Sequence, residues 1–205
     1  MTNLSSQPLS GIRVIDLTSV MFGPYATQYL GDFGAEVIKV ESPDGDVVRK
    51  VGPSANFGMG AAFLGCNRNK KSVVVDLKCE AGMEALWKLI ESADLFLHNV
   101  RPQKIEKLGL SSREVMKRKP DIVYAALHGY LEEGPYSGKP AYDDVIQGEC
   151  GLAGAFTLRD GTPSLVPSII ADKSAGLVAL SGILAALFQR FRHGEGVYME
   201  VGMFE

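Results

Sequence analysis

One stretch near the start of the chain, residues 12–24, decides the fold and reads IRVIDLTSVMFGP. Residues 13–17 form a β-branched and aliphatic run, which is typical of a buried strand. Gly23 and Pro24 follow, and proline favours the first position of a helix. A strand that leads into a helix predicts a parallel sheet, because parallel strands are joined by crossover connections.

The same alternation continues along the chain. Further strands are predicted at residues 36–41, 72–77, 94–99, 121–127 and 197–203, and helices at 24–33, 80–91, 111–119 and 173–191. We therefore expect an α/β fold with an open, mostly parallel, Rossmann-like sheet and helices on both faces. Residues 42–71 and 129–141 are rich in glycine, proline and polar side chains, and loops of this length are usually functional or disordered.

The composition is that of an ordinary globular domain. Of 205 residues, 21 are Lys or Arg and 24 are Asp or Glu, and the net charge of −3 disfavours a cationic nucleic-acid binder. Cys66, Cys79 and Cys150 form no CxxC pair, so we expect a reducing cytoplasm. Residues 1–8 lack the features of a secretory signal. The longest apolar run, 175–188, is too short to span a membrane and predicts a buried helix.

Candidate ligand-binding residues lie near the ends of the predicted strands, because ligands of open parallel sheets gather beyond the carboxyl ends. The helix start at Pro24 could hold an anion, although a plain turn is the more frequent explanation. Two basic clusters could meet a phosphate-rich ligand, or form solvated cationic surfaces. They are Arg68, Lys70 and Lys71 before one strand, and Arg101, Lys104 and Lys107 after another.

Several functions are disfavoured by missing motifs. A nicotinamide dinucleotide site needs GxGxxG in the first turn, and only Gly23 is present; Glu41 alone mimics the ribose-binding acid. His98, His128 and His193 lack the spacing of metal ligands, so we predict no metal site. No serine lies in a GxSxG turn, which disfavours a serine hydrolase.

Asp172 lies between a strand-like apolar run and the long apolar helix. A carboxylate at such a junction is most often an N-cap, which accepts hydrogen bonds from free backbone amides. The functional alternative is a nucleophile that forms a covalent acyl intermediate. The two roles do not exclude each other.

An ordered set of motifs runs along essentially the whole chain. It consists of residues 9–18 (LSGIRVIDLT), 23–27 (GPYAT), 31–41 (GDFGAEVIKVE), 69–72 (NKKS), 141–143 (AYD), 171–172 (AD) and 194–196 (GEG). Taken in order, these stretches resemble the class III coenzyme A transferases of the CaiB/BaiF type, the family of formyl-CoA transferase and carnitine CoA-transferase.

The resemblance implies that Asp172 is the catalytic aspartate of a CoA-transferase. Its carboxylate would attack an acyl-CoA, form a mixed anhydride and then an aspartyl-CoA thioester, and a free carboxylic acid would complete the exchange. CoA is then a substrate, and no permanently bound cofactor is expected. The resemblance places Tyr142 beside the acyl group and lines the CoA channel with Val20, Met21, Asn99, Val100 and Lys107. From charge and position we add Lys71 and Arg101.

Two positions bear on the choice between functions. Met21 stands where formyl-CoA transferase has a glutamine, so we expect a larger or less polar acyl group than formyl. The related α-methylacyl-CoA racemase needs a histidine where Tyr142 stands, and a tyrosine with a pKa near 10 exchanges protons poorly at neutral pH. A racemase-type isomerase with Asp172 as a base remains an alternative, as does a non-catalytic CoA-binding fragment.

The resemblance also has implications for organisation. Members of this family are longer and form interlocked homodimers. Residues 1–205 would be the amino-terminal, CoA-binding part of the large domain, with a small domain and a carboxyl-terminal return segment outside this chain. The uncovered edge of the last predicted strand leads to the same expectation. We expect a cytoplasmic homodimer that acts on acyl-CoA and a small carboxylic acid, without nucleic-acid or membrane partners.

Overall fold

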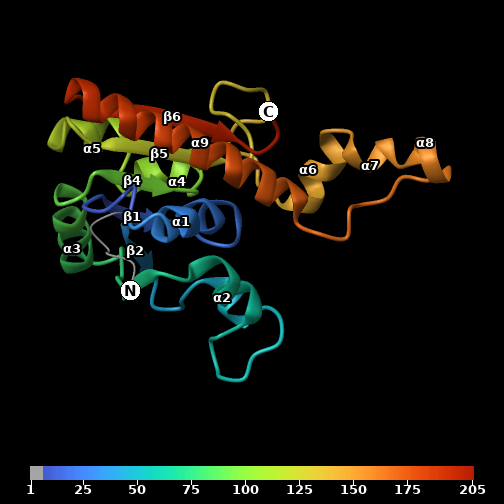
Figure 1. Ribbon diagram of the computed structural model, residues 1–205, viewed down its shortest axis with the longest axis horizontal. Coiled ribbons are helices and arrows are strands. Elements are labelled where there is room, and N and C mark those ends of the chain that lie inside the picture. The colour runs from blue at the N-terminus through green and yellow to red at the C-terminus, as the bar shows by residue number, and fades with distance from the viewer. Residues whose placement is uncertain (1–6) are drawn as a thin grey trace.

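The computed structural model describes residues 7–205 and shows an open sheet of six parallel strands (Figure 1). The order β3-β2-β1-β4-β5-β6 is that of a doubly wound sheet, and it leaves a crevice between the carboxyl ends of β1 and β4. The predicted α/β fold is confirmed. The strands are β1 (Arg13–Leu17), β2 (Glu36–Glu41), β3 (Lys70–Val74), β4 (Leu95–His98), β5 (Val123–His128) and β6 (Val197–Gly202).

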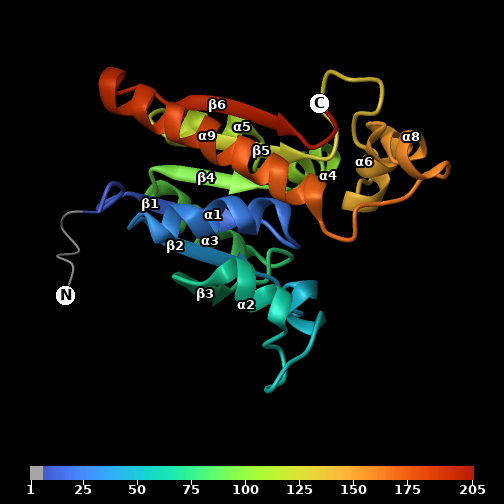
Figure 2. The ribbon, with the colours of Figure 1, turned by 45° about the vertical axis from the view of Figure 1, so that its right-hand side comes forward.

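Helices cover both faces of the sheet. One face packs against α1 (Phe22–Asp32) and α9 (Ile170–His193). The other packs against α3 (Glu80–Glu91), α4 (Pro102–Lys107) and α5 (Ser112–Arg118). Figure 2 shows the short helices near α6 extending beyond the carboxyl end of the sheet. The remaining helices are η2 (Val47–Lys50), α2 (Ala61–Asn67), α6 (Asp143–Glu149), α7 (Leu152–Ala155) and α8 (Thr157–Asp160).

Side chains of alternating residues along a strand point to opposite faces of the sheet, so each apolar strand contributes to an apolar cluster on either face. Leu95 and Leu97 of β4 belong to the cluster under α1 and α9, whereas Phe96 belongs to the cluster under α3 to α5. All of β4 and β5 is buried, which is typical of parallel strands covered on both faces.

Helix α9 is long and apolar enough to cross a membrane by length and composition alone. In this fold it packs along α1 and β6. Ala179 and Ile183 are fully buried, whereas Phe188 and Phe191 are exposed, so the predicted buried helix buries one side only. Gly176 permits the close approach of α1, since a Cβ there would lie 3.1 Å from the carbonyl oxygen of Phe22. The amino-terminal ends of α1 and α9 therefore meet.

Three sequence expectations need correction. The strand expected at 72–77 lies at Lys70–Val74, because β3 pairs in register with β2 from Lys70 onward. The expected loop 42–71 contains η2 and α2. Asp172 is not the N-cap of α9: that residue is Ile169, and Asp172 lies within the first turn.

Candidate active site

A cavity of about 410 Å³ opens where the carboxyl ends of β1, β4 and β5 meet. A smaller cavity of about 90 Å³ continues inward to Asp172. Together they connect the surface with a buried carboxylate. The residues that line both cavities are Val20, Asn99, Gly129, Ala141 and Tyr142.

The loop between β1 and α1 forms one wall and is held in a strained conformation. Val20 has a φ of 67°, a left-handed conformation that β-branched residues rarely adopt. Asn99, which directly follows β4, holds the loop with two hydrogen bonds to Ser19. Its Oδ1 accepts the N–H of Ser19 at 2.9 Å, and its Nδ2 donates to the carbonyl of Ser19 at 2.8 Å. The N–H of Val20 donates to Oδ1 of Asp46 at 3.2 Å.

Buried charges support this loop from below. Nζ of Lys39 donates to the carbonyl of Thr18 at 2.8 Å and lies 2.9 Å from the carboxylate of Asp46. Beside it, the carboxylate of Asp16 lies 3.1 Å from Nζ of Lys70. Burial opposes the ionisation of Asp16, but Lys70 and Lys39, together with hydrogen bonds from Thr18 and Thr27, outweigh burial and hold its pKa at about 2. Two buried ion pairs, Lys39 with Asp46 and Lys70 with Asp16, therefore support the loop.

Asp172 lies at the inner end of the small cavity, where α9 begins. Its backbone N–H donates to Oδ1 of Asp143, the first residue of α6, at 2.8 Å. Asp143 is held in turn by Nε2 of Gln147 at 2.5 Å. The amide of Gln147 also accepts the N–H of Val166 at 2.8 Å, and thereby connects α6 to the segment before α9. These contacts fix Asp172 relative to the crevice.

The environment of Asp172 favours a reactive carboxylate. Its exposed fraction is 8%, and among residues 7–205 no lysine or arginine forms an ion pair with it. Burial, followed by the charge of Asp143, raises the pKa of Asp172 to about 6, although the backbone N–H of Phe22 opposes the rise. At neutral pH the group is ionised yet poorly solvated, and such a carboxylate can act as a nucleophile or a base.

Sulfur atoms lie near this carboxylate. Met21 is the N-cap residue of α1, and its Sδ lies 3.8 Å from Sγ of Cys66. Burial raises the pKa of the Cys66 thiol, and the negative charge of Asp172 contributes to the rise. Cys66 therefore stays protonated at neutral pH.

The structure brings together most of the residues predicted for the site. Val20, Asn99 and Tyr142 line the small cavity with Asp172. Val100 and Arg101 line the larger cavity. Tyr142 is 68% exposed, so its ring borders the opening.

Other predicted residues lie elsewhere. Met21 lines neither cavity, although it contacts Cys66. Lys107 ends α4 and also lines neither cavity, whereas Lys104 lines the larger one. Lys104 also borders a second, more apolar groove of about 590 Å³ beside the ends of β2 and β3. The cation that reaches the crevice from α4 is therefore Lys104.

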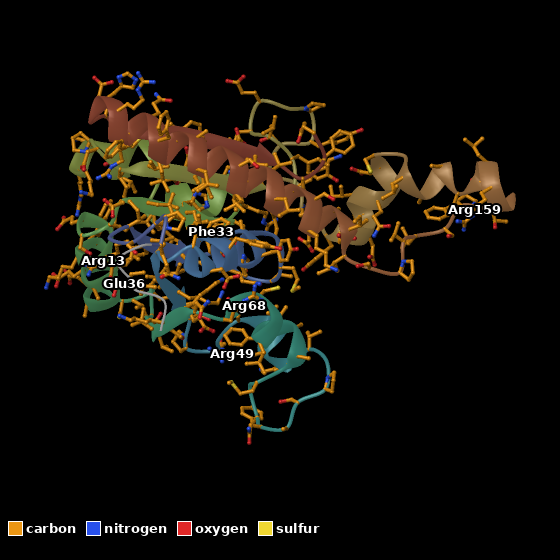
Figure 3. All side chains as sticks on the ribbon, viewed as in Figure 1. Arg13, Phe33, Glu36, Arg49, Arg68 and Arg159 are labelled. Carbon is orange, nitrogen blue, oxygen red and sulfur yellow. The ribbon has the colours of Figure 1, made fainter. Side chains whose placement is uncertain are left out.

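The basic cluster before β3 does not reach the crevice. Lys70 is buried against Asp16, and Arg68 pairs with Asp32. Nζ of Lys71 lies 2.7 Å from the carboxylate of Glu36, the first residue of β2 and thus at the amino end of the sheet. Figure 3 shows Glu36 beside Arg13 at this end. These charges are used in internal ion pairs.

Sequence reasoning missed several site residues. Lys139 lines the larger cavity, and its only sequence signal was its place in the long loop after β5. Asp143 follows Tyr142 in the recognised AYD motif, but the sequence did not indicate that it contacts Asp172. Lys39 and Asp46 carried no local signal, because their roles depend on contacts with the distant β1–α1 loop.

Fold and site define a doubly wound α/β protein with a ligand crevice at the switch point and an unpaired carboxylate at its base. Residues 9–205 match the family described as CoA-transferase family III. The chain therefore belongs to this family, which confirms the resemblance seen in its motifs.

Individual relatives agree with this assignment. The chain is 38% identical, over 97% of its length, to a succinyl-CoA:glutarate CoA-transferase of Mus musculus, of which it covers 46%. It is 38% identical, over 100% of its length, to a probable fatty acyl-CoA transferase of Mycobacterium tuberculosis, of which it covers 52%. A crystal structure of a CAIB/BAIF family protein from Brucella suis superposes with a TM-score of 0.92 at 34% identity, over 97% of this chain and 53% of that one. The chain spans about half the length of the curated relatives it matches.

Proposed function

We propose that this chain carries the acyl-CoA-binding and nucleophile-bearing part of a CoA-transferase, which exchanges CoA between an acyl-CoA and a free carboxylic acid. The observation that carries the proposal is the position of Asp172, a buried and unpaired carboxylate at the inner end of a cavity open to the surface. Family membership supports the same chemistry.

In the proposed reaction, a carboxylate oxygen of Asp172 attacks the thioester carbonyl. The carbon–sulfur bond breaks, CoA leaves as a thiolate, and a mixed anhydride forms. The thiolate then attacks the Asp172 carbonyl of the anhydride, releases the donor acid as a carboxylate and leaves an aspartyl-CoA thioester. The acceptor carboxylate repeats the two steps in reverse order and regenerates Asp172. Covalent catalysis of this kind replaces one difficult exchange by several easier steps.

The cavities provide a path for the long CoA molecule. Lys104 borders both the 410 Å³ cavity and the apolar 590 Å³ groove, so one cation could contact phosphate while the groove receives an apolar part of the ligand. Arg101 and Lys139 add positive charge to the larger cavity. Val20 and Asn99 line the passage inward, which suits the narrow pantetheine arm.

By the family resemblance, the acyl group would lie beside Met21 and Tyr142; of these, Tyr142 lines the cavity that reaches Asp172, and Met21 lies against Cys66. Met21 and Cys66 offer no strong hydrogen-bond donor, so we propose an acyl group larger or less polar than formyl. Relatives include a succinyl-CoA:glutarate CoA-transferase and a probable fatty acyl-CoA transferase, so succinyl-CoA is a reasonable first donor. A clear preference for formyl-CoA over succinyl-CoA would contradict this part of the proposal.

We retain a cytoplasmic homodimer as part of the proposal. The exposed apolar side chains Leu177, Phe188 and Phe191 on α9 are consistent with a protein partner on that helix. Analytical ultracentrifugation of the purified protein tests this assembly, and a monomer at micromolar concentration would contradict it.

The test is the intact mass of the protein after incubation with succinyl-CoA. We expect an acyl-sized or CoA-sized adduct that is absent in Asp172→Ala and is converted by hydroxylamine to a hydroxamate on Asp172. Asp144→Ala, which removes an exposed aspartate on α6, is the matched control and should keep the adduct. A racemase-type isomerase would bind the acyl-CoA without any adduct. An adduct that persists in Asp172→Ala would place the nucleophile elsewhere.

A further inference from the structure

Three side chains with metal-ligating atoms meet at the ends of β5 and β6. His128 is the last residue of β5, Glu200 lies in β6, and Glu132 lies in the loop that follows β5. Ala126 pairs with Glu200 in the sheet, so Glu200 and His128 project from the same face. The ring nitrogen of His128 and one oxygen from each carboxylate all lie within 4.8 Å of one another.

The ring of His128 carries an unused ligand atom. Its exposed fraction is 4%, and its buried Nε2 has no hydrogen-bond partner among residues 7–205. This atom lies 3.3 Å from Oε1 of Glu132 and 4.0 Å from Oε1 of Glu200, so it faces both carboxylates. Glu132 thus lies within ion-pair distance of Nε2 without forming a hydrogen bond to it, and a buried polar atom that lacks a hydrogen bond costs about 1–3 kcal/mol.

The neighbouring His98 shows the opposite arrangement. Its Nδ1 accepts the N–H of Val100 at 3.2 Å, and its Nε2 lies 2.7 Å from the hydroxyl of Tyr124. The hydroxyl of Tyr124 donates to the carbonyl of Leu110 at 2.8 Å. Both ring nitrogens of His98 thus have partners, whereas Nε2 of His128 forms no hydrogen bond with any of residues 7–205.

The carboxylates lack compensating charge. Within residues 7–205, neither carboxylate forms an ion pair with a lysine or an arginine. A bound cation would supply the missing charge.

We propose that His128, Glu132 and Glu200 bind one divalent transition-metal ion of the Zn²⁺ or Mn²⁺ type. One imidazole with two carboxylates is a mixed nitrogen and oxygen set, which suits these ions better than Mg²⁺ or Ca²⁺. Two ligands about 2.1 Å from a tetrahedral ion lie about 3.4 Å apart. This spacing is close to the 3.3 Å between Nε2 of His128 and Oε1 of Glu132, and a side-chain rotation brings Glu200 nearer.

The surroundings leave room for further ligands and give the ion a structural role. Glu132 lines a cavity of about 230 Å³ and His128 lines the 410 Å³ cavity, so water has two routes to the cluster and can complete the coordination. The N–H of Glu132 already donates to Oε1 of Glu200 at 2.8 Å, and the ion would reinforce this link between the loop and β6. Gly129 and Tyr130 of the same loop line the 410 Å³ cavity, so the ion would hold one wall of the crevice in place.

The test is a calorimetric titration of the purified, chelator-treated protein with MnCl₂ and with ZnCl₂. We expect one ion per chain, and an affinity reduced at least about tenfold in both His128→Asn and Glu132→Gln. Glu132→Gln is the safer variant, because the side chain of Glu132 is 42% exposed and its loss should not affect folding. Glu200→Gln tests the third ligand while keeping an oxygen for the N–H of Glu132.

Two controls separate this site from unspecific binding. Glu114→Gln removes a carboxylate on α5 and should leave the affinity unchanged. Cys79→Ser removes an exposed thiol that could bind zinc and should also have no effect. The proposal is overturned if neither ion binds at millimolar concentration. It is also overturned if binding survives in His128→Asn and Glu132→Gln, which would indicate an adventitious ion only.

Discussion

Asp16 and Asp172 are both buried carboxylates near the carboxyl end of the sheet, yet their surroundings differ. Asp16 contacts Lys70 and accepts hydrogen bonds from Thr18 and Thr27, and its pKa lies at about 2. Asp172 is buried beside Asp143, no lysine or arginine of the described residues pairs with it, and its pKa lies at about 6. Burial alone raises the pKa of both groups, so the difference comes from the partners.

The two carboxylates therefore differ in what they can do: Asp16 supports the structure, whereas Asp172 is available to a ligand. The paired charges around Asp16 hold the strained β1–α1 loop and lie away from the cavities. The unpaired carboxylate lies where a ligand can reach it. A buried carboxylate that lacks a counter-charge in the free protein is a candidate for chemistry with a ligand, because its charge is poorly compensated until the ligand arrives.

The largest effect is expected for Asp172→Asn. Covalent adduct formation should be lost, because the amide is not a nucleophile. The same change should stabilise the fold at neutral pH. The folded pKa is raised, so the contribution of Asp172 to stability falls as pH rises from 3.8 to about 6, by roughly 3 kcal/mol. Urea unfolding at pH 7.5 and pH 4 checks this: a variant that is less stable than the wild type at pH 7.5 would contradict the raised pKa.

The next effect concerns the paired carboxylate. Asp16→Asn should destabilise the fold by about 3–5 kcal/mol, because it leaves the buried Lys70 without its counter-charge. The folded pKa is lowered, so the stability from Asp16 is present above pH 3.8 and is lost as pH falls toward about 2. Urea unfolding measures both the loss of stability in Asp16→Asn and its dependence on pH. Glu36→Gln breaks exposed ion pairs and serves as the control, with an expected loss below about 1 kcal/mol. Equal losses of unfolding free energy in Asp16→Asn and Glu36→Gln would contradict the expectation that the buried ion pair matters more than the exposed ones.

A smaller effect is expected for Asp143→Asn, which removes a negative charge beside Asp172. The variant keeps an oxygen for the N–H of Asp172 but removes the negative charge, so the pKa of Asp172 should fall below about 6. The rate of adduct formation, measured against pH, should then reach half its maximum at a lower pH. An unchanged midpoint would show that burial alone sets the pKa of Asp172.

The smallest effect is expected for the lysines of α4, of which one lines the crevice and one does not. Lys104 lines the crevice, whereas Lys107, three residues further along α4, does not. Lys104→Met should weaken acyl-CoA binding about fivefold, because one charged contact with phosphate is lost. Lys107→Met should change binding less than twofold by the same reasoning. Calorimetric titration with CoA compares them, and a larger effect at Lys107 would support the position implied by the family resemblance.

Much of the fold could be predicted from local patterns. Runs such as residues 13–17 and 36–41 are strands in the structure with the same boundaries, because their apolar side chains need burial on both faces. The boundaries of β3 were wrong because its pairing partner, β2, determines where the ladder begins. Asp172 was identified as the main candidate, but the N-cap role was assigned to the wrong residue.

The roles of charged residues were harder to predict. Lys71 and Lys107 satisfied a charge pattern, but the first pairs with Glu36 and the second lines neither cavity. Lys139 and Asp143 were not singled out, although one lines the crevice and the other contacts Asp172. Counting charges along a chain does not show which of them are already paired.

The sequence by itself determined the alternation of strands and helices and the family, and it singled out Asp172 as the candidate nucleophile, because hydrophobic periodicity and ordered motifs are local properties of the chain. Only the tertiary structure decided which charges are paired and which are free. Lys70 is separated from Asp16 by 54 positions, and Asp172 from Asp143 by 29. Contacts at such separations exist only once the sheet has assembled, and they set the pKa of each carboxylate and thereby its role.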